Sequence, residues 1–259
     1  MLDSLTHLAG PAGLPGLVGA GAAVLLAGFL RGFVGFGAAL IAVPSLSLVF
    51  SPAVAIPIAC LSGLPSVIQF LPTAIRHADR PFVAPMALAA FLAAPLGTWL
   101  LVSAAPELVR IGIGVTVLAM AAFLHRGWRL TRRPGKLLLL AVGGAAGFIQ
   151  GIAGVGGPPV VAVALSRAGD AVTQRANVIA AVTALALSTV LPLWRLGLFT
   201  EEVLWLSLVF VPLHTGAAWL GARFFRHSGD RHFRAAALLT LSAIGAFTLA
   251  ISLRDYLAG

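Results

Sequence analysis

Long apolar stretches separated by short polar breaks occupy most of the chain. Six of them are uninterrupted, at residues 53–75, 82–104, 108–125, 176–194, 202–222 and 235–253, and two longer ones, at 14–50 and 137–166, are broken by glycines. A helix of roughly 20 residues crosses a hydrocarbon core of about 30 Å. The stretches are continuously apolar, which excludes the alternating strands of an outer-membrane barrel. The pattern therefore predicts an all-α polytopic membrane protein.

The two broken stretches contain related glycine clusters. The first is Gly28-Phe-Leu-Arg-Gly32-Phe-Val-Gly35-Phe-Gly37, and the second is Gly147-Phe-Ile-Gln-Gly151-Ile-Ala-Gly154-Val-Gly156-Gly157-Pro158-Pro159. A constant offset of 119 positions superposes their shared glycines, and without a gap it also pairs Arg76 with Arg195 and Gly97 with Gly216. Such a match indicates an internal duplication. It predicts one membrane domain of two homologous halves, residues 1–134 and 135–259, each with a broken stretch followed by three plain spans.

The distribution of Lys and Arg discriminates between two topologies. If each broken stretch crosses as one kinked helix, these residues divide nine to seven between the two faces. If each is a re-entrant hairpin with arms of about fifteen residues, only six segments cross and the division becomes thirteen to three. Short cytoplasmic loops are enriched in Lys and Arg. The charges therefore favour six crossings, with both termini outside.

Three crossings in each half would make the halves inverted with respect to each other. Inverted repeats with broken helices near the membrane midplane recur in secondary transporters. Helical arms that begin after Gly37 and Gly157 would direct free N–H groups and a positive dipole end at that level, where an anion binds favourably. Small-xxx-small helix packing is the alternative explanation of the spacings from Gly28 to Gly32 and from Gly147 to Gly151.

The composition supports a membrane protein and narrows its chemistry. Hydrophobic residues make up 59% of the chain and charged residues 10%, against roughly 25% charged in a soluble domain. The net charge of +9 is then mostly a cytoplasmic coat that orients the chain, and no nucleic acid is expected as a partner. The single cysteine, Cys60, excludes an internal disulfide and a multi-cysteine metal cluster, and no cofactor is predicted.

All eight acidic residues fall in predicted loops or at the termini. A cation pathway or a carboxylate proton relay normally needs an acid inside the membrane, so both are disfavoured. Walker-type and Gly-x-Ser-x-Gly motifs are also absent from the sequence, which argues against ATP hydrolysis and against an enzyme of the serine hydrolase type.

The paired glycine clusters that open the two halves, the Gly154-Val-Gly-Gly-Pro-Pro159 stretch and the chain length resemble the TauE/SafE family of membrane transporters, also called the sulfite exporter family. The resemblance covers essentially the whole chain. It implies transport of sulfite, sulfonates such as sulfoacetate, or related organic anions across the bacterial inner membrane. A related group that handles thiosulfate uses several membrane cysteines, and the presence of Cys60 alone argues against that chemistry.

Arg31 is the most informative single residue, because it lies inside the first glycine cluster. An arginine within a membrane span is a candidate functional group by default, and its guanidinium matches the oxygens of a sulfonate or carboxylate. Snorkelling from a helix end is the alternative. Gln150 occupies the same position in the second cluster, where it could bind the anion or tie the broken backbone together.

Further candidates come from the turns and from polar residues inside the spans. The candidate substrate-binding set comprises Arg31, Gly35, Gly37, Gln150, Gly154, Gly156, Gly157, His214, Asn177 and Gln69. His214 lies far from any predicted loop and could carry a proton or pack as a neutral side chain. Arg175 is either a donor near the site or a mark of the cytoplasmic boundary. Hydrogen bonds between helices are an adequate explanation of Gln69, Ser62, Ser66, Thr183 and Ser188.

These features favour a secondary transporter that binds a small anion between the two glycine turns. A channel-like anion pore on the same scaffold is the alternative, and an intramembrane enzyme is less favoured. The expected partners are the small anionic substrate and the lipid bilayer, and a homodimer is left open.

Overall fold

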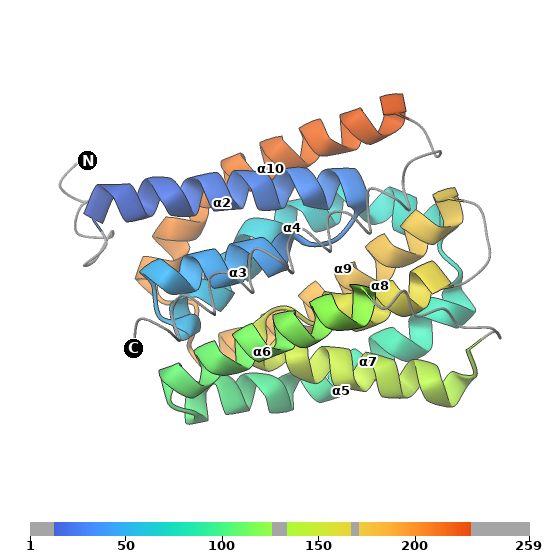
Figure 1. Ribbon diagram of the computed structural model, residues 1–259, viewed down its shortest axis with the longest axis horizontal. Helices are drawn as coiled ribbons and strands as arrows, with labels where there is room; N and C mark the ends of the chain where they lie inside the picture. Colours follow the sequence, from blue (N-terminus) through green and yellow to red (C-terminus); the bar gives the residue numbers. More distant parts are fainter. Residues whose placement is uncertain (1–12, 126–133, 167–170, 229–259) are drawn as a thin grey trace.

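The computed structural model describes residues 13–125, 134–166 and 171–228 (Figure 1). Within these ranges the chain forms nine α-helices and no strand, namely α2 (Gly13–Val34), α3 (Ala38–Val49), α4 (Pro52–His77), α5 (Arg80–Ser103), α6 (Pro106–His125), α7 (Lys136–Ala153), α8 (Gly157–Ser166), α9 (Ala171–Arg195) and α10 (Glu201–Ser228). The predicted all-helical polytopic fold is confirmed. The apolar stretch at 235–253 lies outside the described residues.

Six of these helices are long and apolar enough to cross a membrane, namely α2, α4, α5, α7, α9 and α10. The two broken stretches have arms of unequal length. The first arms, α2 and α7, have 22 and 18 residues, whereas the second arms, α3 and α8, have 12 and 10. The expectation of arms of about fifteen residues each is therefore wrong. Each hairpin combines a helix of full membrane length with a half-length return.

The two hairpins open toward opposite ends of the bundle (Figure 1). The chain leaves α3 at the end where α2 begins, and it leaves α8 at the end where α7 begins. Between them, α4, α5 and α6 are joined by short turns and cross the bundle three times. This is the arrangement expected of inverted halves with re-entrant arms. The orientation of the two ends relative to a membrane stays a prediction.

The internal duplication extends to the helix boundaries. Val34 and Ala153, which end α2 and α7, are 119 positions apart, and so are Ala38 and Gly157, which begin α3 and α8. The same offset relates the first residues of α4 and α9. The sequence repeat is thus also a repeat of helix starts and stops.

The constant offset of 119 positions no longer relates equivalent residues in α10, the helix that follows α9. A methyl group at Gly97 would overlap the carbonyl oxygen of Phe148, and one at Gly221 would overlap the carbonyl oxygen of Phe29, which is the repeat partner of Phe148. Gly216 has no heavy atom within 4 Å of such a methyl group. The structural counterpart of Gly97 is therefore Gly221, at an offset of 124, and its pairing with Gly216 is wrong. Five extra residues are taken up between the end of α9 and the first turn of α10.

Glycines bring two helix pairs into backbone contact, α2 with α10 and α5 with α7. A Cβ atom at Gly32 would overlap the carbonyl oxygen of Ala218, and one at Gly151 would overlap that of Ala94. Gly28 and Gly147 make equivalent contacts one turn earlier in their helices. These four glycines are packing positions. Helix packing therefore explains the first glycines of each cluster, whereas later glycines in the same clusters form the turns.

We expect Gly221→Ala to destabilise the protein and Gly216→Ala to leave it intact. The two glycines lie on the same helix, but only Gly221 packs against the backbone of α2. Forcing an extra methyl group into a packed interface costs about 1–3 kcal/mol. The thermal unfolding midpoint in detergent should fall by several degrees for Gly221→Ala alone. An equal fall for Gly216→Ala would contradict the revised register.

The topology can be tested at two short turns, between α4 and α5 and between α5 and α6. In a Cys60→Ala background, a cysteine at Ala78 should be labelled from the cytoplasmic side, because Arg76 and Arg80 flank it. A cysteine at Ala104 should be labelled from the opposite side. The measurement is labelling by a membrane-impermeant maleimide in intact cells, where only Ala104→Cys should react, and in inside-out vesicles, where only Ala78→Cys should react. Labelling of Ala78→Cys in intact cells would contradict the predicted topology.

Candidate functional site

A cavity lies where the two breaks meet the long helices of the bundle. Its wall is formed by the end of α2, the start of α3, the middle of α4, the break between α7 and α8, and parts of α9 and α10. Its volume of about 90 Å³ is several times the roughly 10–15 Å³ that one water needs. The wall is mostly apolar, and its side chains with polar atoms are Arg31, Cys60, Ser62, Ser66, Gln150, Thr189 and His214.

The cavity brings together six of the ten candidate residues, which are Arg31, Gly37, Gln150, Gly154, Gly157 and His214. Gly35 and Gly156 belong to the breaks but do not line it. Asn177 also does not line it, and its Oδ1 accepts a hydrogen bond from the backbone N–H of Asp79 at 2.7 Å. Asn177 thereby holds the residue that precedes α5. Gln69 is half-buried on α4, away from the lining.

The chain reverses at glycines with left-handed backbone. Gly35, Gly37 and Gly154 have φ of 92°, 91° and 68°, a region that residues with a Cβ rarely adopt. The N–H of Gly35 donates to the carbonyl of Arg31, and the N–H of Gly154 donates to the carbonyl of Gln150, each at 2.9 Å. These bonds close the last turns of α2 and α7. They also place Arg31 and Gln150 at the same point of the two breaks.

Arg31 is held inside the bundle by two hydrogen bonds. Its side chain is 5% exposed, Nη1 donates to the carbonyl oxygen of Gly35 at 2.9 Å, and Nη2 donates to Oγ1 of Thr183 on α9 at 3.1 Å. A guanidinium has five N–H groups, and Arg31 makes no further hydrogen bond within the described part of the chain. The head therefore does not snorkel to a surface, and three donors stay available at the cavity.

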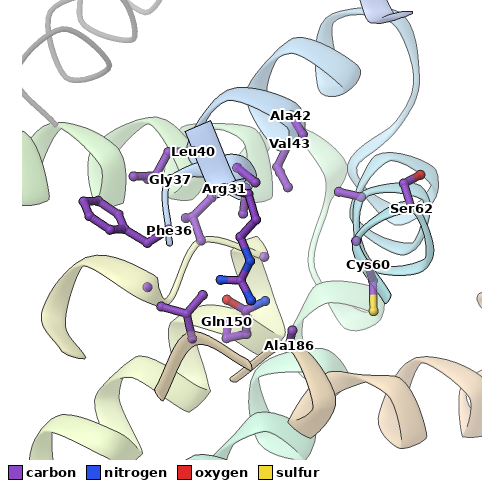
Figure 2. Close-up of a pocket in the computed structure, with 18 of the residues that line it drawn as sticks. Arg31, Phe36, Gly37, Leu40, Ala42, Val43, Cys60, Ser62, Gln150 and Ala186 are labelled. Carbon is purple, nitrogen blue, oxygen red and sulfur yellow. The ribbon is translucent and has the colours of Figure 1, made fainter. Parts of the chain in front are cut away.

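Gln150 is oriented by the second break. Its Oε1 accepts a hydrogen bond from the N–H of Gly156 at 2.9 Å. Because a backbone N–H only donates, the amide oxygen must face Gly156, and this fixes the position of the amide nitrogen. Figure 2 shows the amide of Gln150 directed toward the guanidinium of Arg31. The amide thus ties the broken backbone together and still presents two N–H donors on the cavity side.

The field at the cavity is positive. The described carboxylates lie at helix starts: Asp79 precedes α5, Glu107 is in the first turn of α6, and Glu201 and Glu202 are in the first turn of α10. None of these four lines the cavity. The N-terminal ends of α3 and α8 form part of its wall. The C-terminal ends of α2 and α7 meet the same breaks, so helix dipoles of both signs converge there and Arg31 carries the net positive charge.

A second buried arginine supports the end of α2. Arg175 on α9 is 9% exposed, its Nη2 donates to the carbonyl oxygen of Gly32 at 2.8 Å, and its guanidinium lies 4.1 Å from the ring centroid of Phe225. It is therefore not a surface mark of the cytoplasmic boundary. Its guanidinium provides a hydrogen-bond donor to one of the carbonyls that the end of a helix leaves unpaired.

Several wall residues have roles that differ from one another. Ser66 bonds within α4 to the carbonyl of Gly63, and Thr183, which does not line the cavity, makes the expected bond between helices with Arg31. Ser62 lines the cavity, and its hydroxyl has no partner in the described part of the chain. Cys60 and Thr189 face each other across the wall with 4.0 Å between Sγ and Oγ1. No pattern in the sequence singled out Thr189.

A positive cavity between two broken helices, enclosed by long apolar spans, is the type of site that membrane transporters use. The chain belongs to the sulfite exporter TauE/SafE family, whose model matches residues 20–248. No curated protein and no solved structure matches it significantly. The chain is therefore a multi-pass membrane protein of a transporter family.

We expect Thr183→Val to destabilise the protein through Arg31. The substitution preserves side-chain shape but removes the acceptor of Nη2, and an unpaired buried donor costs about 1–3 kcal/mol. Thr98→Val is the matched control, because Thr98 is equally buried but bonds only within its own helix, to the carbonyl of Ala94. Thermal unfolding in detergent should separate the two variants. Equal midpoints would mean that the bond between α2 and α9 contributes nothing.

Proposed function

We propose that this protein is a secondary transporter of small sulfur-containing oxyanions, such as sulfite or sulfoacetate, in the bacterial inner membrane. The observation that carries the proposal is a buried arginine in a cavity whose wall contains no carboxylate among the described residues. Membership of the sulfite exporter family supports an anion as the cargo. The choice among anions rests on the chemistry of the cavity.

The electrostatic argument begins with the cost of Arg31. A charged side chain at the centre of a bilayer costs at least about 2.5–3.5 kcal/mol, and it is normally paired with an opposite charge. In this protein the guanidinium is bonded only to a carbonyl and a hydroxyl, which are neutral acceptors. A bound anion would supply the missing negative charge. The uncompensated positive charge of Arg31 therefore favours the binding of an anion in the cavity.

The donors around the cavity match the oxygens of a sulfonate or sulfite group. Arg31 has N–H groups that no described residue accepts, and the amide of Gln150 is directed toward its guanidinium. The helix α3 begins at the wall, and no side chain caps it at Gly37. Three oxygens spread around a sulfur atom can accept from donors on different sides at once. A guanidinium provides two parallel donors to such a group.

A transporter is favoured over a channel-like pore by the form of the site. The cavity lies at two helix breaks, and secondary transporters bind their substrates at such breaks. A single chain forms the whole cavity, so a homodimer is not needed to complete it. Saturable uptake and exchange of labelled for unlabelled anion would support a transporter, and a flux that does not saturate would support the pore.

We expect Arg31→Ala to abolish anion binding and Arg31→Lys to weaken it by roughly 10–100-fold. Lysine keeps the charge but loses the planar pair of donors, and a hydrogen bond to a charged group contributes about 1.5–3 kcal/mol. The measurements are thermal shift and saturable uptake in proteoliposomes with sulfite, sulfate, sulfoacetate and simple carboxylates. Unchanged uptake by Arg31→Ala would refute the assigned role of this residue.

Gln150→Glu provides an independent control of the same charge argument. The carboxylate would still accept the N–H of Gly156, so the break should stay intact, but it would pair with Arg31 and neutralise the cavity. We expect this variant to keep its thermal midpoint without ligand and to lose the shift with sulfite or sulfoacetate. A retained shift would mean that net charge is not what binds the anion.

A further inference from the structure

His214 is a polar group of the cavity that the anion site described above does not use. It lies near the middle of α10, is 3% exposed and lines the cavity. Its Nδ1 is buried and forms no hydrogen bond within the described part of the chain. A buried polar atom without a partner carries a free-energy penalty. Within the described part of the chain, no hydrogen bond at Nδ1 therefore fixes the protonation state of the imidazole, whose ring lines the cavity.

The ionisable groups that share the cavity with His214 come from two helices. α10 packs against α2 and α4, which contribute Arg31 and Cys60 to the same wall. Arg31 stays protonated, and the Cys60 thiol can change its charge only by losing a proton. α3, which also lines the cavity, has no ionisable side chain. Among the described residues at this wall, only the imidazole can gain a positive charge.

Other charged groups near α10 are distant from His214 along the helix. Glu202, the nearer of the two acids at the start of α10, is about 18 Å away at 1.5 Å per residue. Arg223 is about 14 Å further along on the same measure. Arg175 of α9 contacts α10 at Phe225, which lies about three helical turns beyond His214 at 3.6 residues per turn. Arg31 is therefore the charge that acts most directly on the imidazole.

We propose that His214 is the proton site of this transporter, so that a proton and the anion occupy the cavity together. The inference rests on the proposed function and adds its coupling ion. An empty cavity holds the charge of Arg31, which opposes a second positive charge nearby. A bound dianion reverses the sign of the cavity to −1, and an imidazolium then restores neutrality. Each ligand thus raises the affinity of the other.

The charge balance makes the coupling depend on the anion. A monoanion such as isethionate is neutralised by Arg31 alone. A dianion such as sulfoacetate needs one further positive charge, and a proton taken up at His214 supplies it. No covalent step is involved, since the proton binds the ring nitrogen and is released with the anion. The consequence is symport of one proton with each dianion.

The test uses the full chain in proteoliposomes with labelled sulfoacetate, whose charge is constant between about pH 6 and 8 because carboxyl groups titrate near pH 4. We expect an inward proton gradient to drive accumulation, a protonophore to collapse it, and sulfoacetate entry to acidify the lumen. Isethionate entry should not acidify it. Saturable sulfoacetate uptake without lumenal acidification would overturn the proton site and leave the anion site standing.

His214→Gln provides the matched variant, because glutamine can still hydrogen-bond but cannot become cationic. We expect gradient-driven accumulation to fall at least tenfold while sulfoacetate exchange stays measurable. Thr215→Val is the control, since Thr215 is the next residue of α10 and does not line the cavity; it should accumulate sulfoacetate as the wild type does. Full gradient-driven accumulation by His214→Gln would overturn the inference.

A binding measurement separates a proton site from a structural role. In the wild type, sulfoacetate affinity should rise about tenfold between pH 8 and pH 6, and in His214→Gln the profile should be flat. A variant that is only misfolded would lose affinity at every pH. If neither sulfoacetate nor sulfite shows saturable flux with the wild type, the proposed function itself fails. A pH-independent wild-type affinity with normal flux would overturn the proton site alone.

Discussion

A helix that ends inside a membrane protein leaves backbone groups without partners, and the two breaks of this chain are organised around that constraint. Water is not available to the buried groups, so side chains must satisfy them. The guanidinium of Arg31 does so for the carbonyl of Gly35, and the amide of Gln150 does so for the N–H of Gly156. Arg31 and Gln150 are repeat partners, one as a donor and one as an acceptor. The residues that hold the breaks together are also those that line the cavity, so the structural and chemical requirements of the site coincide.

The two breaks and the helices that pack on them have matching helix boundaries and different chemistry. In the register that places Gly97 on Gly221, His214 corresponds to Ala90, just as Arg31 corresponds to Gln150. The α2–α10 pair thus carries both the permanent charge and the imidazole, whereas the equivalent α5–α7 pair contributes an amide. The two breaks are equivalent in position, and among the described residues of these pairs the ionisable groups at the cavity belong to one of them. The positive character of the cavity follows from this asymmetry together with the location of the described acids at helix starts.

Apolar runs, glycine clusters and charge counts were sufficient to predict the helical class, the breaks and the repeat. They identified Arg31, Gln150 and His214, because charged or amide side chains are conspicuous in apolar sequence. They did not predict the register shift after α9, since a small insertion beside a turn leaves no polar signal. Asn177 was misleading because holding the start of α5 and binding a ligand both require a polar residue near a helix end. The bond from Arg31 to Thr183 and the contact between Thr189 and Cys60 arise from helix packing, which spacing along one helix does not reveal.

The glycine contacts have a consequence for motion. Where two helices touch through their backbones, no layer of side chains can change rotamer to let them slide, and a shift of one residue would drive a Cβ atom into a carbonyl. The α2–α10 and α5–α7 pairs must therefore move as rigid bodies. Sliding inside either pair is therefore blocked by the backbone contacts, and relative motion of helices in this bundle is easier between the two pairs than within them.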